Sequence, residues 1–238
     1  MFIKSSNQLF IIAVCVFSLV SCNSGTIAPV VELHPQYSMN KSQTTYVVRP
    51  GDTLYAIAFL YDINYEQLAQ ANQISYPYHL KSGQIIRLIP KGCQTKVYEP
   101  LVRRAPHVSY RPQISRSVWQ WPTQGHIAKP DYNRPIEQKG IGILGQPRQP
   151  ILAAADGVVA YAGDGLPGYG HLILIKHGND FLSAYAFNAS NLVHEGERVY
   201  AGQKIATMGR LQTGEWGLHF EIRYRGSVLN PLKFLPSH

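Results

Sequence analysis

The hydrophobic and polar positions divide the chain into segments with different periods. Leu9 to Val20 is a continuous apolar run behind a short basic start, and it is too short to span a membrane as a helix. Residues 23–44 are polar and show no period. From Tyr46 onward, a segment with helical spacing lies between two short apolar runs. From Trp119 onward, the pattern is that of short strands separated by glycine turns. The pattern therefore predicts a leader, a polar tether and two folded parts.

The first folded part, residues 46–90, is predicted as strand, helix, helix, strand. Tyr46–Arg49 predicts a strand, and a turn follows in which Asp52 is placed as the N-cap of a helix. One apolar helical face has the spacing i, i+3, i+4, i+7, at Leu54, Ile57, Ala58 and Tyr61. Asn64 is placed to cap a second helix, and Ile85–Ile89 predicts the closing strand.

The second folded part is predicted to be mainly β. Ile151–Ala155 and Val158–Ala162 are expected to pair as a hairpin, because Asp156-Gly157 between them is a turn signal. Further strands are predicted at His171–His177, Phe181–Phe187, Val199–Ile205 and Leu218–Tyr224. Short strands separated by glycine turns favour a compact β domain over βαβ units.

The last strand has a clear period of two. Leu218, Phe220 and Ile222 point one way and are apolar, whereas His219, Glu221 and Arg223 point the other way. The first set is expected in the core. The second set is expected to face a groove.

Charge narrows the choice of partners. The 22 Lys and Arg residues outnumber 14 Asp and Glu residues, and the net charge of +8 suggests an anionic partner such as lipid, cell-wall polymer or nucleic acid. The chain lacks the aromatic-and-basic pattern of nucleic-acid modules, so we expect no nucleic-acid partner. Residues 91–118 combine Pro with Arg and predict a linker. Its basic cluster either contacts acidic cell-wall peptides or lipid headgroups, or is simply solvated.

The N-terminus carries a motif that assigns a compartment. Leu19-Val20-Ser21-Cys22 resembles the bacterial lipobox, which implies a signal peptide over 1–21, an acylated Cys22 and a tether over 22–45. Asn23 resembles the outer-membrane sorting pattern, so we expect a lipid anchor on the periplasmic face of the outer membrane. The alternative is a plain secretory signal with a chance cysteine. Once Cys15 is removed and Cys22 is acylated, Cys93 is left alone, without a disulfide partner or a cysteine-based metal cluster.

Residues 46–90 resemble a LysM module. The stretch YVVRPGDTLYAIA, then Asn72, then LKSGQIIRLIP match the opening, middle and close of that family. The resemblance implies binding of N-acetylglucosamine-containing glycans such as peptidoglycan, in a groove between two loops. The glycan-binding residues it implies are Gly51, Asp52, Thr53, Leu54, Ile74, Ser75, Tyr76 and Pro77. Leu54 and Ile74 have an alternative interpretation as core residues.

Residues 119–236 resemble the lysostaphin/LytM family of zinc peptidases. The matching pieces include ADGVVAYAG, GYGHLILIKH, AGQKIATMG and LHFEIR. The family holds zinc with a His and an Asp of an early H-x-x-x-D run and the second His of a late H-x-H, and two further His assist catalysis. A catalytic zinc needs three protein ligands and an open position for water.

This chain departs from the family pattern at those positions. The early His and Asp fall on Gln138 and Gly142, the two catalytic His fall on Phe187 and Gly217, and His219 alone remains. We therefore expect no metal, no cofactor and no catalytic residue. The alternative is a zinc site rebuilt from other histidines, but His171 and His177 lie six residues apart on one predicted strand, too far to chelate one ion.

Lipobox, LysM-like module and degenerate LytM-like domain, in this order, resemble the NlpD-type amidase activators. The resemblance implies an outer-membrane lipoprotein that binds peptidoglycan and activates a periplasmic N-acetylmuramoyl-L-alanine amidase, so that septal cell wall is cut. The residues expected to contact the amidase are Tyr169, Tyr185, Phe187, His219, Glu221 and Arg223. The variant Arg223→Glu is expected to abolish activation with the fold intact. Two rival hypotheses are a purely structural peptidoglycan tether and a zinc endopeptidase with a rearranged site.

Overall fold

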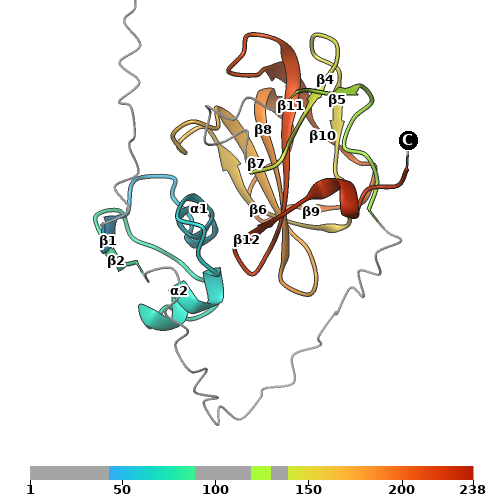
Figure 1. The fold of residues 1–238 in the computed structure, drawn as a ribbon. Coiled ribbons are helices and arrows are strands. Elements are labelled where there is room, and N and C mark those ends of the chain that lie inside the picture. The colour runs from blue at the N-terminus through green and yellow to red at the C-terminus, as the bar shows by residue number, and fades with distance from the viewer. Residues whose placement is uncertain (1–42, 89–118, 130–138, 238) are drawn as a thin grey trace, which may run out of the picture. The chain divides into compact units, whose positions relative to one another are not determined.

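A computed structural model describes residues 43–88, 119–129 and 139–237 (Figure 1). All of them belong to one compact unit, Tyr37–His238. We call residues 43–88 the N-terminal module and residues 119–237 the C-terminal domain. The predicted signal peptide, tether and linker, with Cys22, Cys93 and Gln138, lie outside the described residues. No helix in the described part of the chain is long and apolar enough to cross a membrane.

The N-terminal module has the predicted order of elements, which is confirmed. Strand β1 (Thr45–Val47) is followed by helices α1 (Leu54–Leu60) and α2 (Tyr65–Ala71) and by strand β2 (Ile85–Arg87). The two strands pair antiparallel, with Tyr46 opposite Ile86. The predicted apolar face of α1 is buried at Leu54, Ile57 and Ala58, as its spacing requires.

The prediction that Asp52 caps α1 is wrong. The cap is Thr53, whose hydroxyl accepts a hydrogen bond from the backbone N–H of Ala56. The Asp52 carboxylate instead accepts bonds from the Tyr46 hydroxyl and the Arg49 backbone N–H, each 2.7 Å away, and so closes the turn before the helix. The second predicted cap is confirmed, because Asn64 accepts from the backbone N–H at the third position of α2.

The C-terminal domain is built on one ten-stranded antiparallel sheet, shown in green through yellow to red in Figure 1. Its strands are β3 (His126–Ile127), β4 (Ile141–Leu144), β5 (Pro150–Leu152), β6 (Gly157–Gly163), β7 (His171–Lys176), β8 (Phe181–Asn191), β9 (Arg198–Val199), β10 (Lys204–Arg210), β11 (Trp216–Tyr224) and β12 (Ser227–Leu229). A short 3-10 helix, Pro231–Lys233, follows. Strand β8 is the centre, because it pairs with β7, β10 and β11.

Two sequence predictions about these strands are wrong. Strand β5 pairs with β10, and β6 pairs with β7 and β9, so the expected β5–β6 hairpin does not form. Gly157 is needed for close packing: a Cβ there would lie 2.5 Å from Ile175 Cγ2. The predicted strand Val199–Ile205 is two strands, β9 and β10, because Gly202 has a left-handed φ of +81° and turns the chain.

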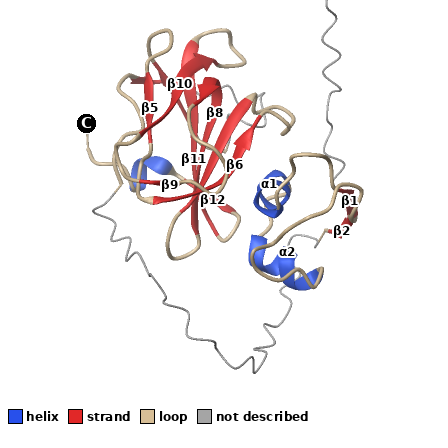
Figure 2. Cartoon of the chain, turned by 180° about the vertical axis from the view of Figure 1, so that it is seen from behind, coloured by secondary structure: helices blue, strands red, loops and turns tan. Residues whose placement is uncertain are grey.

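Strand β11 lies in the middle of the sheet (Figure 2) and confirms the predicted alternation. Leu218, Phe220 and Ile222 are fully buried in an apolar core with residues of β5, β7 and β10. The polar face of the same strand is buried as well, with His219, Glu221 and Arg223 each no more than 2% exposed. A strand with polar residues buried on one face requires a hydrogen-bonding partner for each of them.

Candidate functional site

A cleft of about 630 Å³ opens in the C-terminal domain beside strands β4 and β11. It is lined by Ile127, Ala128, Lys129, Lys139, Gly140, Ile141, Gly142, Phe187, Leu211, Thr213, Glu215, His219, Val228, Leu229, Asn230, Pro231 and Leu232. The lining is mostly apolar, with two lysines and a glutamate. A cavity of this size suits a small molecule or a peptide segment.

Three of the positions that would carry metal and catalytic residues in the LytM family meet in this cleft, namely Gly142, Phe187 and His219. His219 on β11 lies opposite Gly142 on β4 and opposite Ala186 on β8. Phe187, the next residue, has a φ of +61°, and its ring lies 6.3 Å from the His219 ring. Strand register therefore brings together three residues that are far apart in the sequence.

The space beside two of these positions is already filled. A Cβ at Gly217 would lie 2.8 Å from Leu211 Cδ1, and a Cβ at Gly142 would lie 3.0 Å from the Cβ of Ala128. Larger side chains at positions 142 and 217 would therefore displace apolar neighbours. The sequence carried no signal that Leu211 lies here, since the contact depends on the turn between β10 and β11.

The residues in the cleft do not fit a zinc ion. Gly142, Phe187 and Gly217 carry no metal-binding atom, and the Nε2 atom of His219 lies 3.0 Å from Glu221 Oε1. Within residues 43–88, 119–129 and 139–237 no three His, Cys, Asp or Glu side chains come together as a ligand set. Catalytic zinc needs three protein ligands, so the described residues of this cleft do not provide a site for it.

The polar face of β11 is a buried chain of hydrogen bonds. Glu221 is its centre: Oε1 lies 3.0 Å from His219 Nε2, and Oε2 accepts from Arg223 Nε at 2.8 Å. The Tyr169 hydroxyl donates to the same carboxylate at 3.2 Å. Residues two apart on a strand share a face, which is why these three side chains on β11 can bond in series.

The charges within this hydrogen-bonded set of side chains determine which of its members are ionised. Burial alone would raise the pKa of Glu221, but the Arg223 guanidinium and His219 outweigh it, so that pKa lies below its ordinary value. Burial opposes the charge of Arg223, but Glu221, Tyr169 and Asp62 raise the pKa of Arg223 above its ordinary value. Burial and then the Glu221 charge raise the pKa of Tyr169. The site therefore holds an ion pair beside a neutral tyrosine.

Arg223 is bound by the N-terminal module as well. Its Nη1 donates to the backbone carbonyl of Phe59 at 2.7 Å and to Asp62 Oδ1 at 2.8 Å. The guanidinium carbon lies 3.7 Å from the centre of the Phe59 ring. Sequence analysis missed Phe59 and Asp62, because nothing local indicates a contact between positions more than 150 residues apart.

The predicted amidase-contact residues therefore fall into three groups. Phe187 and His219 line the cleft. Tyr169, Glu221 and Arg223 are buried in the hydrogen-bonded chain. Tyr185 forms the third group by itself, in the apolar core.

The placement of Tyr185 in the groove is wrong. Its side chain is fully buried in the apolar core, 5.3 Å from the Phe220 ring, and its hydroxyl accepts from the Ala154 N–H. Because Tyr185 pairs with Phe220 across neighbouring strands, it shares the core face and not the cleft face.

The burial of Arg223 also corrects the expectation for Arg223→Glu. A glutamate there would place a second carboxylate beside Glu221 and Asp62, with the former partners of the arginine unpaired. Breaking a buried ion pair costs about 3–5 kcal/mol. We therefore expect Arg223→Glu to destabilise the fold, and a residue of the open cleft is a better target.

The predicted glycan loops of the N-terminal module are only partly exposed. Gly51–Leu54, Tyr76 and Pro77 line a pocket of about 420 Å³, whereas Ile74 and Ser75 lie outside its lining. Tyr76 is 73% exposed, but Leu54 is only 1% exposed. Leu54 thus agrees with the core interpretation, and the same pocket is also lined by residues of β6.

Comparisons with known proteins match both parts of the chain. The model of Peptidase family M23 matches residues 137–231, and the LysM domain model matches residues 46–88. The uncharacterized lipoprotein YgeR of Escherichia coli is 39% identical over 206 residues, covering 82% of this chain and 82% of that protein. The murein hydrolase activator NlpD of Escherichia coli is 36% identical over 259 residues, covering 82% of this chain and 68% of that protein.

Solved structures of M23 peptidases are similar in part. A putative peptidase M23 from Pseudomonas aeruginosa aligns with 49% of this chain and 49% of its own, at a TM-score of 0.44 and 21% identity. The two family matches define the class, a LysM module joined to a mainly β domain of the M23 type. Within that class, the chain belongs to the family of lipoproteins that includes NlpD and YgeR.

Proposed function

We propose that this protein is a non-catalytic outer-membrane lipoprotein that binds peptidoglycan and activates a periplasmic N-acetylmuramoyl-L-alanine amidase, so that septal cell wall is split during division. One observation carries the proposal. The cleft of an M23-type domain is retained, but its described residues offer apolar side chains where zinc chemistry would need ligands. Relatives of this chain are named murein hydrolase activators, which supports the same conclusion.

The lack of catalysis follows from the side chains. At the early ligand positions stand Gln138, which lies outside the described residues, and Gly142, which has no side chain. Phe187 and Gly217 stand where the two catalytic histidines would be expected from the LytM resemblance. Without a metal-bound water and a general base, the hydrolysis mechanism of a zinc peptidase has no nucleophile.

Activation is binding of a partner segment in the cleft. Phe187, Leu211 and Leu229 offer an apolar surface, and Lys129, Lys139 and Glu215 place charges around it. Such a surface suits an amphipathic peptide or helix. If the amidase exposes that segment only in its open state, then binding shifts the amidase population toward the open state.

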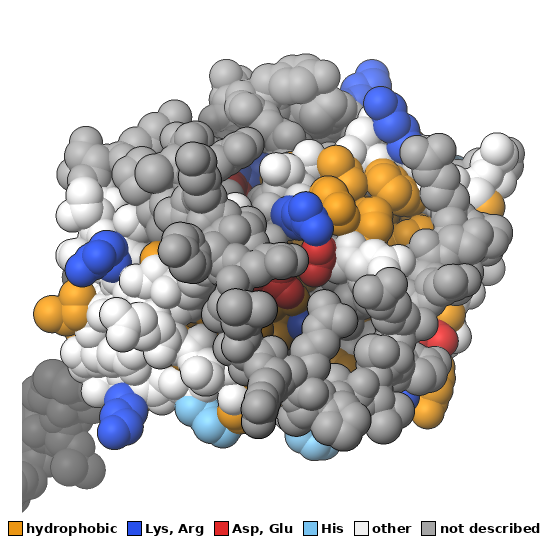
Figure 3. Space-filling view, turned by 90° about the horizontal axis from the view of Figure 1, so that it is seen from below, with side chains coloured by type: hydrophobic (Ala, Val, Ile, Leu, Met, Phe, Trp, Pro, Cys, Tyr) orange, Lys and Arg blue, Asp and Glu red, His pale blue; other side chains and the backbone are white. Residues whose placement is uncertain are grey.

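The proposed localisation and partners rest on the remaining features. An acylated Cys22 would hold the protein on the periplasmic face of the outer membrane, and the LysM module would bind peptidoglycan glycan. Nucleic acid is not a proposed partner. On the face shown in Figure 3 the described Lys and Arg side chains lie at separate places and form no continuous basic patch.

The cleft itself offers the test. Phe187→Asn removes the ring from the cleft but keeps a residue type that tolerates a φ of +61°. We expect the full-length lipoprotein in detergent to release no dye from labelled peptidoglycan alone, and to stimulate the amidase of the same organism. Loss of one aromatic anchor should weaken stimulation at least about tenfold, which corresponds to about 1.4 kcal/mol.

The control is Leu192→Asn, which changes a half-exposed leucine outside the cleft and should leave stimulation unchanged. Chelator-sensitive release without amidase would contradict the proposal and favour a rebuilt zinc peptidase. Full stimulation by Phe187→Asn would remove the cleft from the mechanism. No stimulation of any amidase would leave the peptidoglycan tether, which the LysM match supports, as the better function.

A further inference from the structure

Helix α1 of the N-terminal module covers the polar face of β11. Phe59 and Asp62, at its C-terminal end, hold the Arg223 guanidinium through the hydrogen bonds described above. The Phe59 ring also packs edge-on against Tyr169, with ring centres 5.0 Å apart. The side chain of Arg223 is buried at this contact, and a partner protein cannot reach it.

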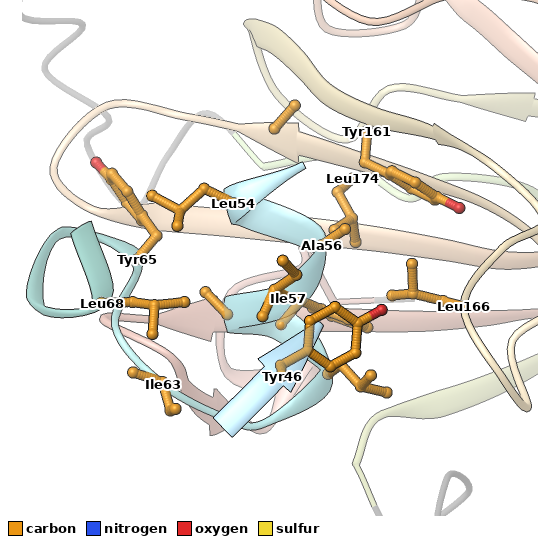
Figure 4. Close-up of a cluster of buried hydrophobic side chains, with 14 of the residues drawn as sticks. Tyr46, Leu54, Ala56, Ile57, Ile63, Tyr65, Leu68, Tyr161, Leu166 and Leu174 are labelled. Carbon is orange, nitrogen blue, oxygen red and sulfur yellow. The ribbon is translucent and has the colours of Figure 1, made fainter. Parts of the chain in front are cut away.

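The contact is apolar along the rest of the helix. Leu54 and Ala56 of α1 share one buried cluster with Tyr161, Leu166 and Leu174 of the C-terminal domain (Figure 4). The backbones also approach closely at the turn between β11 and β12. A Cβ at Gly226 would lie 2.6 Å from the backbone carbon of Ile63, so only glycine fits there.

The N-terminal end of α1 carries the predicted glycan loop. The contact between the N-terminal module and the C-terminal domain covers this loop as well. The Thr53 hydroxyl donates to the carbonyl of Ala160 on β6 at 3.1 Å, in a buried position. Gly51–Leu54, Tyr76 and Pro77 share their pocket with Val158, Val159 and Ala160 of that strand. A glycan chain that used Thr53 and Leu54 would therefore compete with β6 for the same surface.

We propose that the N-terminal module is a lid on the polar face of β11. A glycan chain that binds the Thr53–Leu54 end of α1 displaces β6 from that end and so releases the lid. The inference rests on the proposed function, because it regulates the same site. Peptidoglycan is then an effector of this protein as well as its attachment point. The amidase would be activated where bare glycan is present.

The lid is also connected to the cleft. Asp62 accepts from Lys139 Nζ at 2.9 Å as well as from Arg223, and Lys139 is part of the cleft wall. Release of α1 therefore exposes Arg223 and frees the Lys139 ammonium at the same time. The surface available to a partner grows from the apolar cleft to a cleft with a charged extension.

Linkage makes the proposal testable without any amidase. If glycan binding opens the lid, then a change that opens the lid must strengthen glycan binding by the same factor. When only a fraction of the molecules is in the binding-competent state, the observed affinity of the protein equals the affinity of that state multiplied by this fraction. A mutation far from the glycan loop can therefore raise glycan affinity only by removing the closed state.

Asp62→Lys is the variant that opens the lid. It places an ammonium against Arg223 and Lys139, and it lies at the far end of a seven-residue helix from Thr53, about 10 Å away. Gln70→Lys is the matched control, because it adds a lysine on an exposed position of α2 in the same module. Gly226→Asn is a second opening variant on the other partner, since asparagine tolerates its φ of +81° but wedges against Ile63.

The measurements are titration calorimetry with chitohexaose, a soluble N-acetylglucosamine oligomer, and small-angle scattering, both on the full-length protein in detergent-free nanodiscs. If about nine molecules in ten are closed, Asp62→Lys and Gly226→Asn should bind chitohexaose about tenfold more tightly than the wild-type chain. Both variants should increase the radius of gyration, as should chitohexaose added to the wild-type chain. Gln70→Lys should do neither.

Unchanged affinity and unchanged radius in both opening variants would overturn the lid. A larger radius of gyration without a change in chitohexaose affinity would contradict the release of the lid by glycan. The absence of chitohexaose binding by any of the chains would contradict it as well. The outcomes are separate from those of the amidase assay. Tighter glycan binding by Asp62→Lys together with no amidase stimulation would sustain the lid and reject the proposed function.

Discussion

His177 follows β7 in the core of the C-terminal domain, with both ring nitrogens bonded. Its Nδ1 lies 2.7 Å from the carbonyl oxygen of Asp156, and its Nε2 lies 2.7 Å from the Ser183 hydroxyl. A carbonyl oxygen can only accept, so Nδ1 carries the proton. Burial lowers the pKa of His177 to about 4, although the bond to Asp156 opposes the shift. The ring is therefore neutral at neutral pH.

This neutral histidine predicts a loss of stability in mild acid. Between about pH 6.5, the ordinary histidine value, and about pH 4, the unfolded chain binds a proton that the folded chain does not. The free energy of unfolding should then fall by about 1.4 kcal/mol per pH unit from this residue. Urea unfolding at several pH values in that window measures the slope.

The variant His177→Gln should lose the part of that slope that corresponds to about one proton. We expect this even though the variant is less stable than the wild-type chain at neutral pH. The matched control is His194→Gln, at a side chain that is 86% exposed, and it should keep the wild-type slope. An equal slope in wild type and His177→Gln would show that other groups control the acid response.

At the scale of elements, Asn72 closes the N-terminal module. Its amide donates to the carbonyls of Leu68 and Arg87 and accepts from the Arg87 N–H, which ties the end of α2 to β2. Asn72→Ala leaves these backbone groups without their partner, and each unpaired group costs about 1–3 kcal/mol when water cannot replace it. We expect the module to lose about that much stability, as measured by hydrogen exchange of the β1–β2 amides.

Asn72→Asp supplies a second test of the same bonds. A carboxylate keeps the bond from the Arg87 N–H but sets negative oxygens against the carbonyls of Leu68 and Arg87. It should therefore be as disruptive as Asn72→Ala. Unchanged exchange in both variants would mean that the packing of Leu68 and Ile86 alone holds the module together.

The sequence predicts those elements whose signals are local. The helical spacing of α1 is confirmed, because the helix buries the face that its apolar residues define. The period of two on β11 is confirmed, because its apolar set lies in the core and its polar set lies in a hydrogen-bonded chain. The β5–β6 hairpin is wrong, because the choice of partner strand is made by the whole sheet and not by the Asp156-Gly157 turn signal.

The candidate site shows the same limit. Phe187 and His219 could be placed from motif positions, and they do line the cleft. Tyr185 could not, because residues two apart on a regular strand share a face, and the left-handed φ of Phe187 that interrupts this alternation is invisible in the sequence. The cover over Arg223 depends on a contact between distant segments, which no local pattern encodes.

For the whole molecule, the buried contact between the two folded parts predicts one cooperative unit. Apolar burial along α1 and the Asp62–Arg223 ion pair stabilise the parts jointly, so calorimetry of the wild-type chain should show a single unfolding transition. Asp62→Lys should separate it into two transitions, whereas Gln70→Lys should keep one. Two transitions in the wild-type chain would contradict this coupling.

Leu211 has a consequence for the history of the domain. A histidine at position 217 would require the Leu211 side chain to shift, because Leu211 Cδ1 lies 2.8 Å from where its Cβ would be. A smaller residue at position 211 would make room but would leave a void, and neither change alone provides a catalytic group. A return to zinc catalysis would therefore need coordinated changes at positions 211 and 217, in addition to new side chains at the other ligand positions.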